Sequence, residues 1–430
     1  MSIIPPPTSA QAAANAAALA AAQAAELPRT QMIDISKLPP EQAVAALINR
    51  AAEMGASDLF LLNNEGHLAA MVRHLGIMMP ISTETPESGK RLLAHIRNMS
   101  GMDVSDRRRP ADGRWIYRSD ENSVDLRINT VPTLYGEDMA IRLLVRNNAL
   151  LDVERLGMEP SQLINYRQMI SGPSGLVLIT GPTGSGKTST LYATLMQLND
   201  GHRKINTIED PIEYAVGGLR QSQVNNAIDM GFAEILRSVL RQSPDVIMLG
   251  EIRDEETART AVHAANSGLL VLATIHASTA AAGVQAMRGY NVPNHFLSVA
   301  LRGVVSQRLV RTLDPMSRTE FDISHAPDMF AEVTRYLQPG EGTHLYAPLP
   351  SPSNQMTGYT SRTGIFEVMP IAREIRALIA DGSSAKGIRD KAIETGMLEF
   401  RHAALLKVAR GLTSTEEVFR VIPSDVLVEE

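Results

Sequence analysis

Between Ser57 and about Arg146, apolar and polar residues alternate in short runs that are separated by turn residues. A period of two is typical of β-strands with one buried face. The runs predict strands at 59–62, 68–72, 76–79, 115–117, 124–130 and 139–145. A helical spacing of apolar residues at 91–99 interrupts them. The pattern therefore predicts a small α+β domain that is built on an antiparallel sheet.

Farther along the chain the apolar runs become continuous, as expected of strands that are buried on both faces of a parallel sheet. They predict strands at 174–180, 204–208, 246–249 and 269–273. A glycine-rich loop and a helical run from Ser189 to Leu198 follow the first of them. The others end in acidic or polar residues, at the edge where a doubly wound sheet gathers functional groups. The second region is therefore predicted to be an α/β domain.

The amino-terminal segment has a different composition. Residues 10–25 are almost all alanine, and no Lys or Arg precedes Arg29, which does not fit a secretory signal peptide. We expect a tail that is marginally helical or disordered, with a docking peptide for a partner as the alternative. A helical stretch follows at 41–54. The expected parts are a tail with a linker helix at 1–50, an amino domain at 51–146, a linker at 147–165 and an α/β domain at 166–430, whose carboxyl-terminal helical subdomain begins near 366.

The composition excludes several kinds of protein. The 430 residues carry 41 Lys and Arg against 47 Asp and Glu, which disfavours a uniformly basic nucleic-acid binder. An aromatic content of 4% also argues against stacking on single-stranded nucleic acid. The chain has no cysteine, which removes disulfides, thiolate catalysis and cysteine-ligated zinc. No apolar run reaches the ~18–20 residues of a membrane span, so we expect a soluble, cytoplasmic protein.

A phosphate-binding loop follows the strand at 174–180. Its sequence GPTGSGKT matches G-x-x-x-x-G-K-[ST] between a strand and a helix. Glycine lets backbone N–H groups turn towards phosphate, and the helix amino terminus adds a positive dipole. We expect Lys187 to contact the β- and γ-phosphates of ATP or GTP, and Thr188 to coordinate Mg²⁺. The predicted nucleotide-binding residues are Gly181, Pro182, Thr183, Gly184, Ser185, Gly186, Lys187, Thr188 and Ser189.

Acidic residues and one histidine follow the other strands of this region. A carboxylate after the second strand could orient or deprotonate the attacking water, and the candidates are Glu209, Asp210 and Glu213. Glu251 follows the third strand in the Walker B position and is expected to hold Mg²⁺ through water. His276 follows the fourth strand and is expected to sense the γ-phosphate. Two arginines that flank the third strand are weaker candidates, namely Arg241 and Arg253.

Arginine is unevenly distributed in the amino domain. The residues concerned are Arg107, Arg108, Arg109, Arg114, Arg118, Arg127 and Arg142. They could form a solvated charged loop, a nucleic-acid patch, or a set of phosphate ligands that is offered across a domain or subunit boundary. The last interpretation uses the planar, bidentate guanidinium group to stabilise charge that develops on a phosphate. The residues alone leave this choice open.

Together the motifs resemble the secretion ATPases that drive type II secretion and type IV pilus assembly, the GspE/PilB group. The resemblance extends from Ser57 almost to the carboxyl end. The nucleotide-site motifs are GPTGSGKTSTL for Walker A, TIEDPIEY for the acidic Asp box, LRQSPDVIMLGEIRD for Walker B and TIHAS for the histidine box. PADGRW and VDLRINTVPT resemble the amino-domain arginine segments, and GVVSQRLVRTL, RTGIFEVMPI and GLTSTEEVFRV also fit.

The resemblance implies a RecA-like P-loop NTPase domain with a parallel sheet, preceded by a smaller, PAS-like α+β amino domain. It also implies a homo-hexamer in which the amino domain of one subunit closes over the nucleotide that a RecA-like domain holds. Arg114 and Arg127 align with the family's arginine fingers, and Arg142 is a third candidate. For the base that activates water, Glu213 is the first choice and Glu209 the second.

The sequence departs from the family pattern in three ways, of which the first and third leave the biological system open. Assembly members carry a four-cysteine zinc knuckle near 314–360, where we expect no zinc and a shortened, Pro/Ser-rich loop. Leu269 stands where the family's histidine box opens with a second histidine, so His276 would act alone. We expect the alanine-rich tail to stand in place of the family's larger platform-docking domain. The carboxyl-terminal segment resembles the assembly and type II secretion members more than the retraction motors.

The predicted function is Mg²⁺-dependent ATP hydrolysis that powers type IV pilus assembly or type II secretion through an inner-membrane platform protein and other pilus or secretion components. The protein is expected in the cytoplasm, peripherally associated with the inner membrane, and without direct contact to nucleic acid. A conjugative or type IV secretion ATPase and a pilus-retraction motor are alternatives within this class. A nucleic-acid translocase and a non-hydrolysing, nucleotide-gated scaffold are alternatives outside it.

Overall fold

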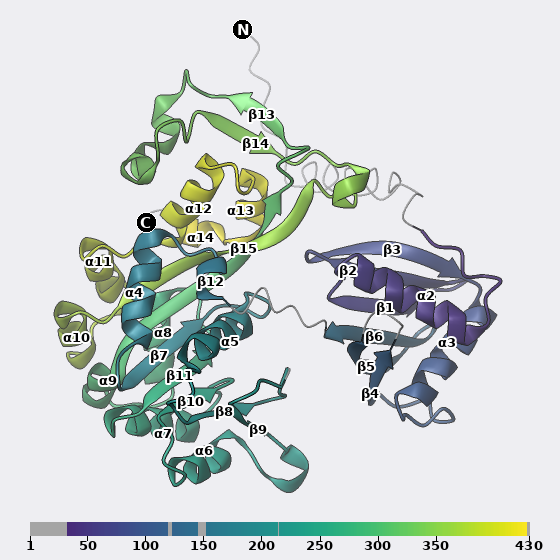
Figure 1. Ribbon diagram of the computed structural model, residues 1–430, viewed down its shortest axis with the longest axis horizontal. Helices are drawn as coiled ribbons and strands as arrows, with labels where there is room; N and C mark the ends of the chain where they lie inside the picture. Colours follow the sequence, from purple (N-terminus) through teal and green to yellow (C-terminus); the bar gives the residue numbers. More distant parts are fainter. Residues whose placement is uncertain (1–31, 119–122, 145–151, 214, 428–430) are drawn as a thin grey trace. The chain divides into compact units, whose positions relative to one another are not determined.

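The computed structural model describes residues 32–118, 123–144, 152–213 and 215–427, apart from the side chains of residues 226, 327, 424 and 425. The alanine-rich segment therefore lies outside the described residues. The chain divides into two compact units, residues 1–145 and residues 146–430 (Figure 1).

The first unit is a six-stranded antiparallel sheet with the order β3-β2-β1-β6-β5-β4. Its strands are β1 Asp58–Asn63, β2 Leu68–His74, β3 Ile77–Glu84, β4 Ala111–Arg118, β5 Ser123–Thr133 and β6 Gly136–Leu144. Alternate strand residues are buried against two helices, α2 Pro40–Glu53 and α3 Pro86–Met99. The alternating sequence pattern had predicted such a half-buried sheet, and the structure contains it.

Helix α2 belongs to the core of the first unit. Its Val44, Leu47 and Ile48 are buried in the same apolar cluster as Leu59 and Leu61 of β1. The sequence had predicted a helix at 41–54 and had placed the domain boundary after residue 50, within that helix. The structure differs because the apolar face of the helix is needed to cover the sheet.

The second unit is a seven-stranded sheet with the order β15-β12-β7-β11-β10-β8-β9. All neighbouring strands are parallel except β15, which is antiparallel to β12. The strands are β7 Gly175–Thr180, β8 Ile205–Glu209, β9 Arg220–Gln223, β10 Val246–Leu249, β11 Leu270–Ile275, β12 Leu301–Leu313 and β15 Tyr359–Pro370. The central strands β7, β10 and β11 are buried along their whole length, in agreement with their continuous apolar sequences.

Helices cover both faces of this sheet (Figure 1). One face packs against α4 Pro160–Ile170 and α5 Lys187–Leu198. The other packs against α6 Phe232–Leu240, α7 Glu255–Asn266, α8 Ala280–Gly289, α9 Asn294–Ala300, α10 Arg373–Ala380 and α11 Ala385–Glu394. The expected α/β class with a parallel sheet is confirmed.

The segment before β7 also packs on the second unit. Val153 lies in the short helix η3 Val153–Arg155, and it is buried with Leu156 and Tyr166 of α4 in one apolar cluster. The sequence had placed residues 147–165 in a linker. Its described part, from residue 152, instead forms η3 and the start of α4, which pack on the second unit.

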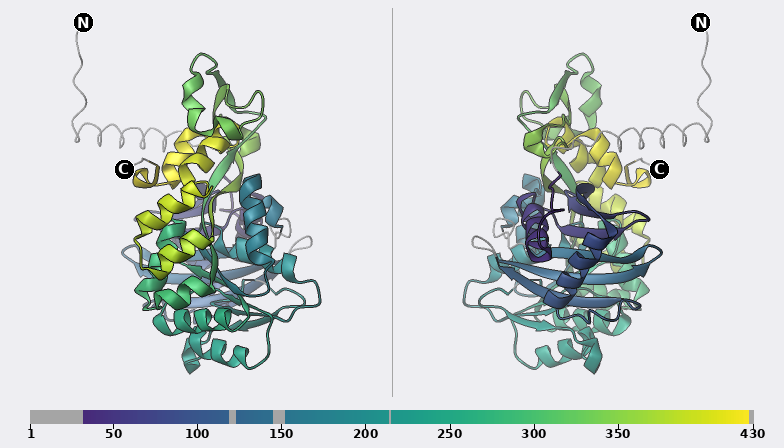
Figure 2. Two further views of the ribbon diagram at one scale, coloured as in Figure 1. Left: turned by 90° about the vertical axis from the view of Figure 1, so that its left-hand side faces the viewer. Right: turned by 90° about the vertical axis from the view of Figure 1, so that its right-hand side faces the viewer.

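Long strands β12 and β15 carry the chain to a separate cap at one end of the second unit (Figures 1 and 2). The cap contains β13 Thr319–Asp322, η5 Pro327–Tyr336, β14 His344–Ala347 and η6 Pro352–Asn354. Ile323, Phe330 and Val333 are buried in one apolar cluster with α12 Phe400–Ala409 and α13 Thr415–Val421. The short helix α14 Ser424–Leu427 follows. A shortened, Pro/Ser-rich loop had been expected here. The segment instead contains secondary structure, because these apolar residues are buried together.

Candidate active site

The phosphate-binding loop joins β7 to α5 at the carboxyl ends of the parallel strands. Gly186 precedes α5 with a φ of 91°, a left-handed conformation that glycine adopts without strain. Gly181 has no room for a side chain, because a Cβ there would lie 2.5 Å from Ser185 Oγ and 2.6 Å from the Gln307 carbonyl oxygen. The loop therefore requires glycine at both positions.

Lys187 lies across this loop. Its ammonium group donates hydrogen bonds to the carbonyl oxygens of Gly181 and Pro182, at 2.8 and 3.1 Å. Burial lowers the pKa of Lys187, the charge of Glu251 opposes that shift, and the charge of Arg308 adds to it. The charges of Lys187 and Glu251 are thus close enough to influence each other.

Gln307 supports the loop from β12 and was not among the predicted site residues. Its side chain is buried, and Nε2 donates to the Ser185 carbonyl oxygen at 2.8 Å. Its Oε1 accepts a hydrogen bond from the Thr190 hydroxyl of α5, also at 2.8 Å. Nothing in the sequence of β12 singles it out, because the strand also contains Ser306, Arg308 and Arg311.

The backbone N–H groups and hydroxyl groups of this loop suit a triphosphate and its metal ion. The Ser185 hydroxyl is buried and has no hydrogen-bond partner within the described structure. Thr188 is exposed in the first turn of α5, where backbone N–H groups lack helical partners. No group of three or more His, Asp or Glu residues that could hold a metal occurs in the part of the chain that the structure describes. A Mg²⁺ ion at Thr188 would therefore draw other ligands from phosphate and water.

The other motif-encoded residues of the loop surround these donors. Pro182, Thr183 and Gly184 are exposed, and Ser189 is half-buried on α5. Their positions fit a loop whose backbone, rather than its side chains, faces a ligand.

Glu251 joins residues from three neighbouring strand ends. Its Oε1 lies 2.8 Å from Nε2 of His276, and its Oε2 accepts from Nε of Arg253 at 2.7 Å. Arg253 also donates to Oδ2 of Asp210 at 3.1 Å. The ends of β8, β10 and β11 thus bring Asp210, Glu251, Arg253 and His276 into one cluster. Arg241, by contrast, ends α6 and donates to the Ser238 hydroxyl.

The two candidate bases have different surroundings. Glu209 is buried, and its carboxylate accepts hydrogen bonds from the hydroxyls of Tyr192 and Thr207, at 2.5 and 2.6 Å. Gln221 donates to the same carboxylate at 3.1 Å. Glu213 is half-buried in the loop between β8 and β9. Of the two, Glu213 has the more accessible position.

In the first unit, the three candidate arginine fingers lie in one row across the sheet. The strand register places Arg114 opposite Arg127, and Arg127 opposite Arg142. The row continues through Asp58 of β1 to Arg73 of β2. Like charges that face one another on adjacent strands destabilise a sheet, so this row needs compensating negative charge.

Two aspartates provide part of that compensation. Arg114 donates to both carboxylate oxygens of Asp125, at 2.9 and 2.5 Å, and Arg142 Nε donates to Asp58 at 3.2 Å. The side chains of Arg114 and Arg142 nevertheless remain 65% and 62% exposed. Arg118 is exposed at the end of β4, and the triplet 107–109 lies in the loop before that strand. The row presents several guanidinium groups to solvent, an arrangement that suits a polyanion.

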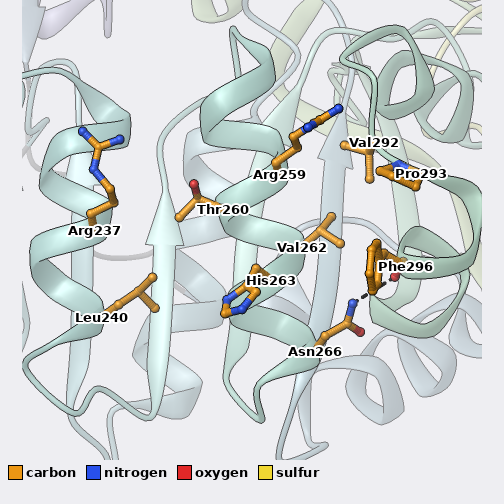
Figure 3. Close-up of a pocket in the computed structure, with 10 residues that line it drawn as sticks. All are labelled: Arg237, Leu240, Arg259, Thr260, Val262, His263, Asn266, Val292, Pro293 and Phe296. Carbon is orange, nitrogen blue, oxygen red and sulfur yellow. Dashed lines mark hydrogen bonds between the residues drawn. The ribbon is translucent and has the colours of Figure 1, made fainter.

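A separate hollow of about 530 Å³ lies between α6, α7 and α9 (Figure 3). Its lining residues are Arg237, Leu240, Arg259, Thr260, Val262, His263, Asn266, Val292, Pro293 and Phe296. None of them belongs to the predicted site. Both arginines already form ion pairs, Arg237 with Glu256 and Arg259 with Glu255. This hollow therefore lies apart from the residues that the sequence predicts for the nucleotide site.

Comparison with known proteins identifies relatives over nearly the whole chain. Residues 35–420 match the family model described as Type II/IV secretion system protein. The chain is 39% identical over 383 residues to type II secretion system protein E of Dickeya dadantii, a match that covers 89% of this chain and 76% of that protein. It is 37% identical over 400 residues to type II secretion system ATPase E of Vibrio cholerae, with 93% and 78% covered.

Solved structures share the fold. The ATPase DotB of Legionella pneumophila superposes with a TM-score of 0.68 at 18% identity, and the match covers 90% of this chain and 97% of that one. The pilus retraction motor PilT with bound ADP gives 0.59 at 24% identity, with 87% and 95% covered. These structures confirm the predicted RecA-like fold class for the second unit. Among the described residues, no helix has the length and apolar character needed to cross a membrane.

Proposed function

The chain belongs to the family of type II/IV secretion system proteins, and from this premise we propose that it is a hexameric, Mg²⁺-dependent ATPase that powers type IV pilus assembly or type II protein secretion. One observation supports the proposal above all. The phosphate-binding loop, Glu251 and His276 follow β7, β10 and β11, three adjacent strands of one sheet. A nucleotide phosphate and its attacking water belong at this edge of such a sheet.

In the proposed mechanism, the loop 181–189 binds ATP. Its backbone N–H groups and the amino terminus of α5 surround the phosphates, and Lys187 moves its ammonium group from loop carbonyls to the β- and γ-phosphates. Thr188 and, through water, Glu251 would hold Mg²⁺, which when bound neutralises phosphate charge. Gln307 keeps the loop in its binding shape.

Hydrolysis proceeds by in-line attack of water on the γ-phosphate, which breaks the bond between that phosphorus and the β–γ bridging oxygen and releases ADP and phosphate. Glu213 accepts the proton of that water, and Glu209 is the second candidate for this role. Glu213 is preferred because it is half-buried, whereas the Glu209 carboxylate is buried. His276, held by Glu251, senses the γ-phosphate.

Arginines from another amino domain complete the site. Arg114 and Arg127 stabilise the charge that develops on the γ-phosphate, and Arg142 is a third donor in the same row. In a homo-hexamer these side chains come from the neighbouring domain or subunit. Domain rotation then turns an inner-membrane platform protein, so that pilin-like subunits are inserted or extracted. The protein would work on the cytoplasmic side, peripherally associated with the inner membrane.

The experiment is a phosphate-release assay on the purified full chain. We expect Mg²⁺-dependent ATP hydrolysis, abolished by EDTA, and a mass six times that of the subunit in the presence of nucleotide. Stimulation by single-stranded DNA with steep salt dependence would instead favour a translocase. Nucleotide binding without phosphate release would favour a scaffold. Binding assays with platform proteins of the different systems would distinguish the proposed function from that of a retraction or conjugative motor.

A further inference from the structure

A buried carboxylate in the middle of β15 connects two helices of the second unit. Glu367 is only 2% exposed. Its Oε2 accepts a hydrogen bond from the backbone N–H of Ala280, the first residue of α8, at 2.9 Å. Its Oε1 accepts one from the N–H of Phe400, the first residue of α12, at 3.3 Å. One side chain therefore binds the amino termini of two helices that are far apart in sequence.

The first of these helices follows the loop that carries His276. This loop, residues 276–279, lies between β11 and α8. Besides the contact at Ala280, the carbonyl oxygen of Ser278 accepts hydrogen bonds from Arg308 Nη2 at 2.9 Å and from the Ser306 hydroxyl at 3.3 Å. Strands β12 and β15 thus fix the end of the loop opposite to His276. His276 in turn lies 2.8 Å from Glu251.

The position of Glu367 is costly for an acid. Desolvation raises its pKa to about 7, although the two N–H donors and the nearby Arg389 lower it and the charge of Glu399 adds to the rise. The guanidinium group of Arg308 also faces it, above the ring of Phe400. A neutral side chain would avoid the cost of burying a charge. An acid at this position therefore carries a cost, which its hydrogen bonds to two helix amino termini partly offset.

We propose that Glu367 is a positioning residue for nucleotide hydrolysis, which holds the loop 276–279 in place and thereby keeps His276 against Glu251. The inference rests on the proposed ATPase function. Glu367 acts only through His276 and does not touch the reacting atoms. Its carboxylate is suited to this task because two oxygens can hold the sensor loop and α12 at once, whereas an amide offers one acceptor.

A double-mutant cycle on the full chain tests this. Glu367→Gln and His276→Ala are made singly and together, and kcat and KM for ATP are measured by phosphate release. We expect Glu367→Gln to lower kcat about tenfold with KM within about twofold, and to add less than about twofold in the His276→Ala background. Glu417→Gln is the matched control. Glu417 is another buried carboxylate that accepts from two arginines, Arg311 and Arg420, and it should change kcat by less than about twofold in either background.

The outcomes are distinguishable. An equal loss of kcat in both backgrounds, or no loss in either, overturns the inference while the ATPase function stands. A parent protein that releases no phosphate overturns the proposed function and the inference with it. If Glu367→Gln gives no folded protein, as judged by circular dichroism, Glu367→Asp replaces it in the same cycle. The shorter acid keeps the charge but not the reach to both N–H groups.

Discussion

The polar side chains that support the phosphate-binding loop of the second unit are buried, whereas Arg114 and Arg142 in the arginine row of the first unit are largely exposed to solvent. Around the phosphate-binding loop, Gln307 and Glu209 are buried and hydrogen-bonded to neighbouring strands and helices. In the first unit, Arg114 and Arg142 extend from the sheet and form ion pairs with Asp125 and Asp58. The two regions therefore differ in how far their geometry is fixed before a ligand arrives.

This difference leads us to expect that nucleotide binding and turnover depend on different units. Buried, hydrogen-bonded groups keep one arrangement, so the second unit has a complete phosphate-binding loop of its own. Exposed ion pairs contribute little stability, and a row of guanidinium groups gains most when an anion neutralises it. We therefore expect substitutions in the second unit to affect nucleotide binding, and substitutions in the arginine row to affect the chemical step.

The largest effect is expected from Lys187→Ala. Because this ammonium group is the cation within the loop, its loss should weaken ATP binding and lower kcat by about 10³-fold or more. Fluorescent-nucleotide titration and phosphate release measure the two quantities. Lys386→Ala, at an exposed position of α11, is the control and should match the parent. Parent-like turnover by Lys187→Ala would refute the assignment of the loop.

A comparable loss, restricted to turnover, is expected from Arg127→Ala. A missing arginine finger should lower kcat by about 10³-fold while the Kd for ATP stays within a few-fold. Arg118→Ala removes an arginine that lies outside the row, on β4, and should leave both quantities close to those of the parent. Equal losses of affinity and turnover in Arg127→Ala would contradict the division of roles between the units.

The smallest expected effect is a change in the free energy of unfolding, and it tests a buried group of the second unit, Glu367. The folded-state pKa of Glu367, about 7, lies above its ordinary value of 4.5. The protonated form therefore contributes stability that is fully present below about pH 4.5 and is lost as the pH rises through about 7. Relative to Glu367→Gln, which cannot titrate, the parent should lose about 1–3 kcal/mol between pH 5 and 8.5.

Thermal unfolding in a series of buffers measures this as a Tm difference of a few degrees. The difference between the parent and Glu367→Gln should shrink or reverse as the pH rises. A difference that is constant with pH would show that Glu367 does not titrate in this range.

The sequence predicted much of the fold because its apolar pattern and glycine motif act locally. Continuous apolar runs identified the buried strands β7, β8, β10 and β11, though not β12 and β15, and GPTGSGKT identified a loop in which Gly181 and Gly186 are sterically required. Contacts between distant segments were not predictable in the same way. Gln307 lies more than a hundred residues from the loop that it supports, and Glu367 joins helices that begin at residues 280 and 400.

Strand register was the second feature that could not be predicted from the sequence. The sequence named Arg114, Arg127 and Arg142 separately, but only the pairing of β4, β5 and β6 places them in one row. The cap at residues 314–360 shows a third limit. Its apolar residues are too few and too widely spaced to give a periodic signal, although Phe330 and Val333 are fully packed in the structure.

Subunit mixing tests most directly whether the first unit of one subunit and the second unit of another form one active site. Lys187→Ala and Arg127→Ala are each expected to be nearly inactive, but the first retains its arginine row and the second its phosphate-binding loop. When the two variants are combined under conditions in which labelled subunits exchange, activity should return, to at most about a quarter of the parent rate in a random ring. If the exchanged mixture stays as inactive as its components, the site is not shared between subunits.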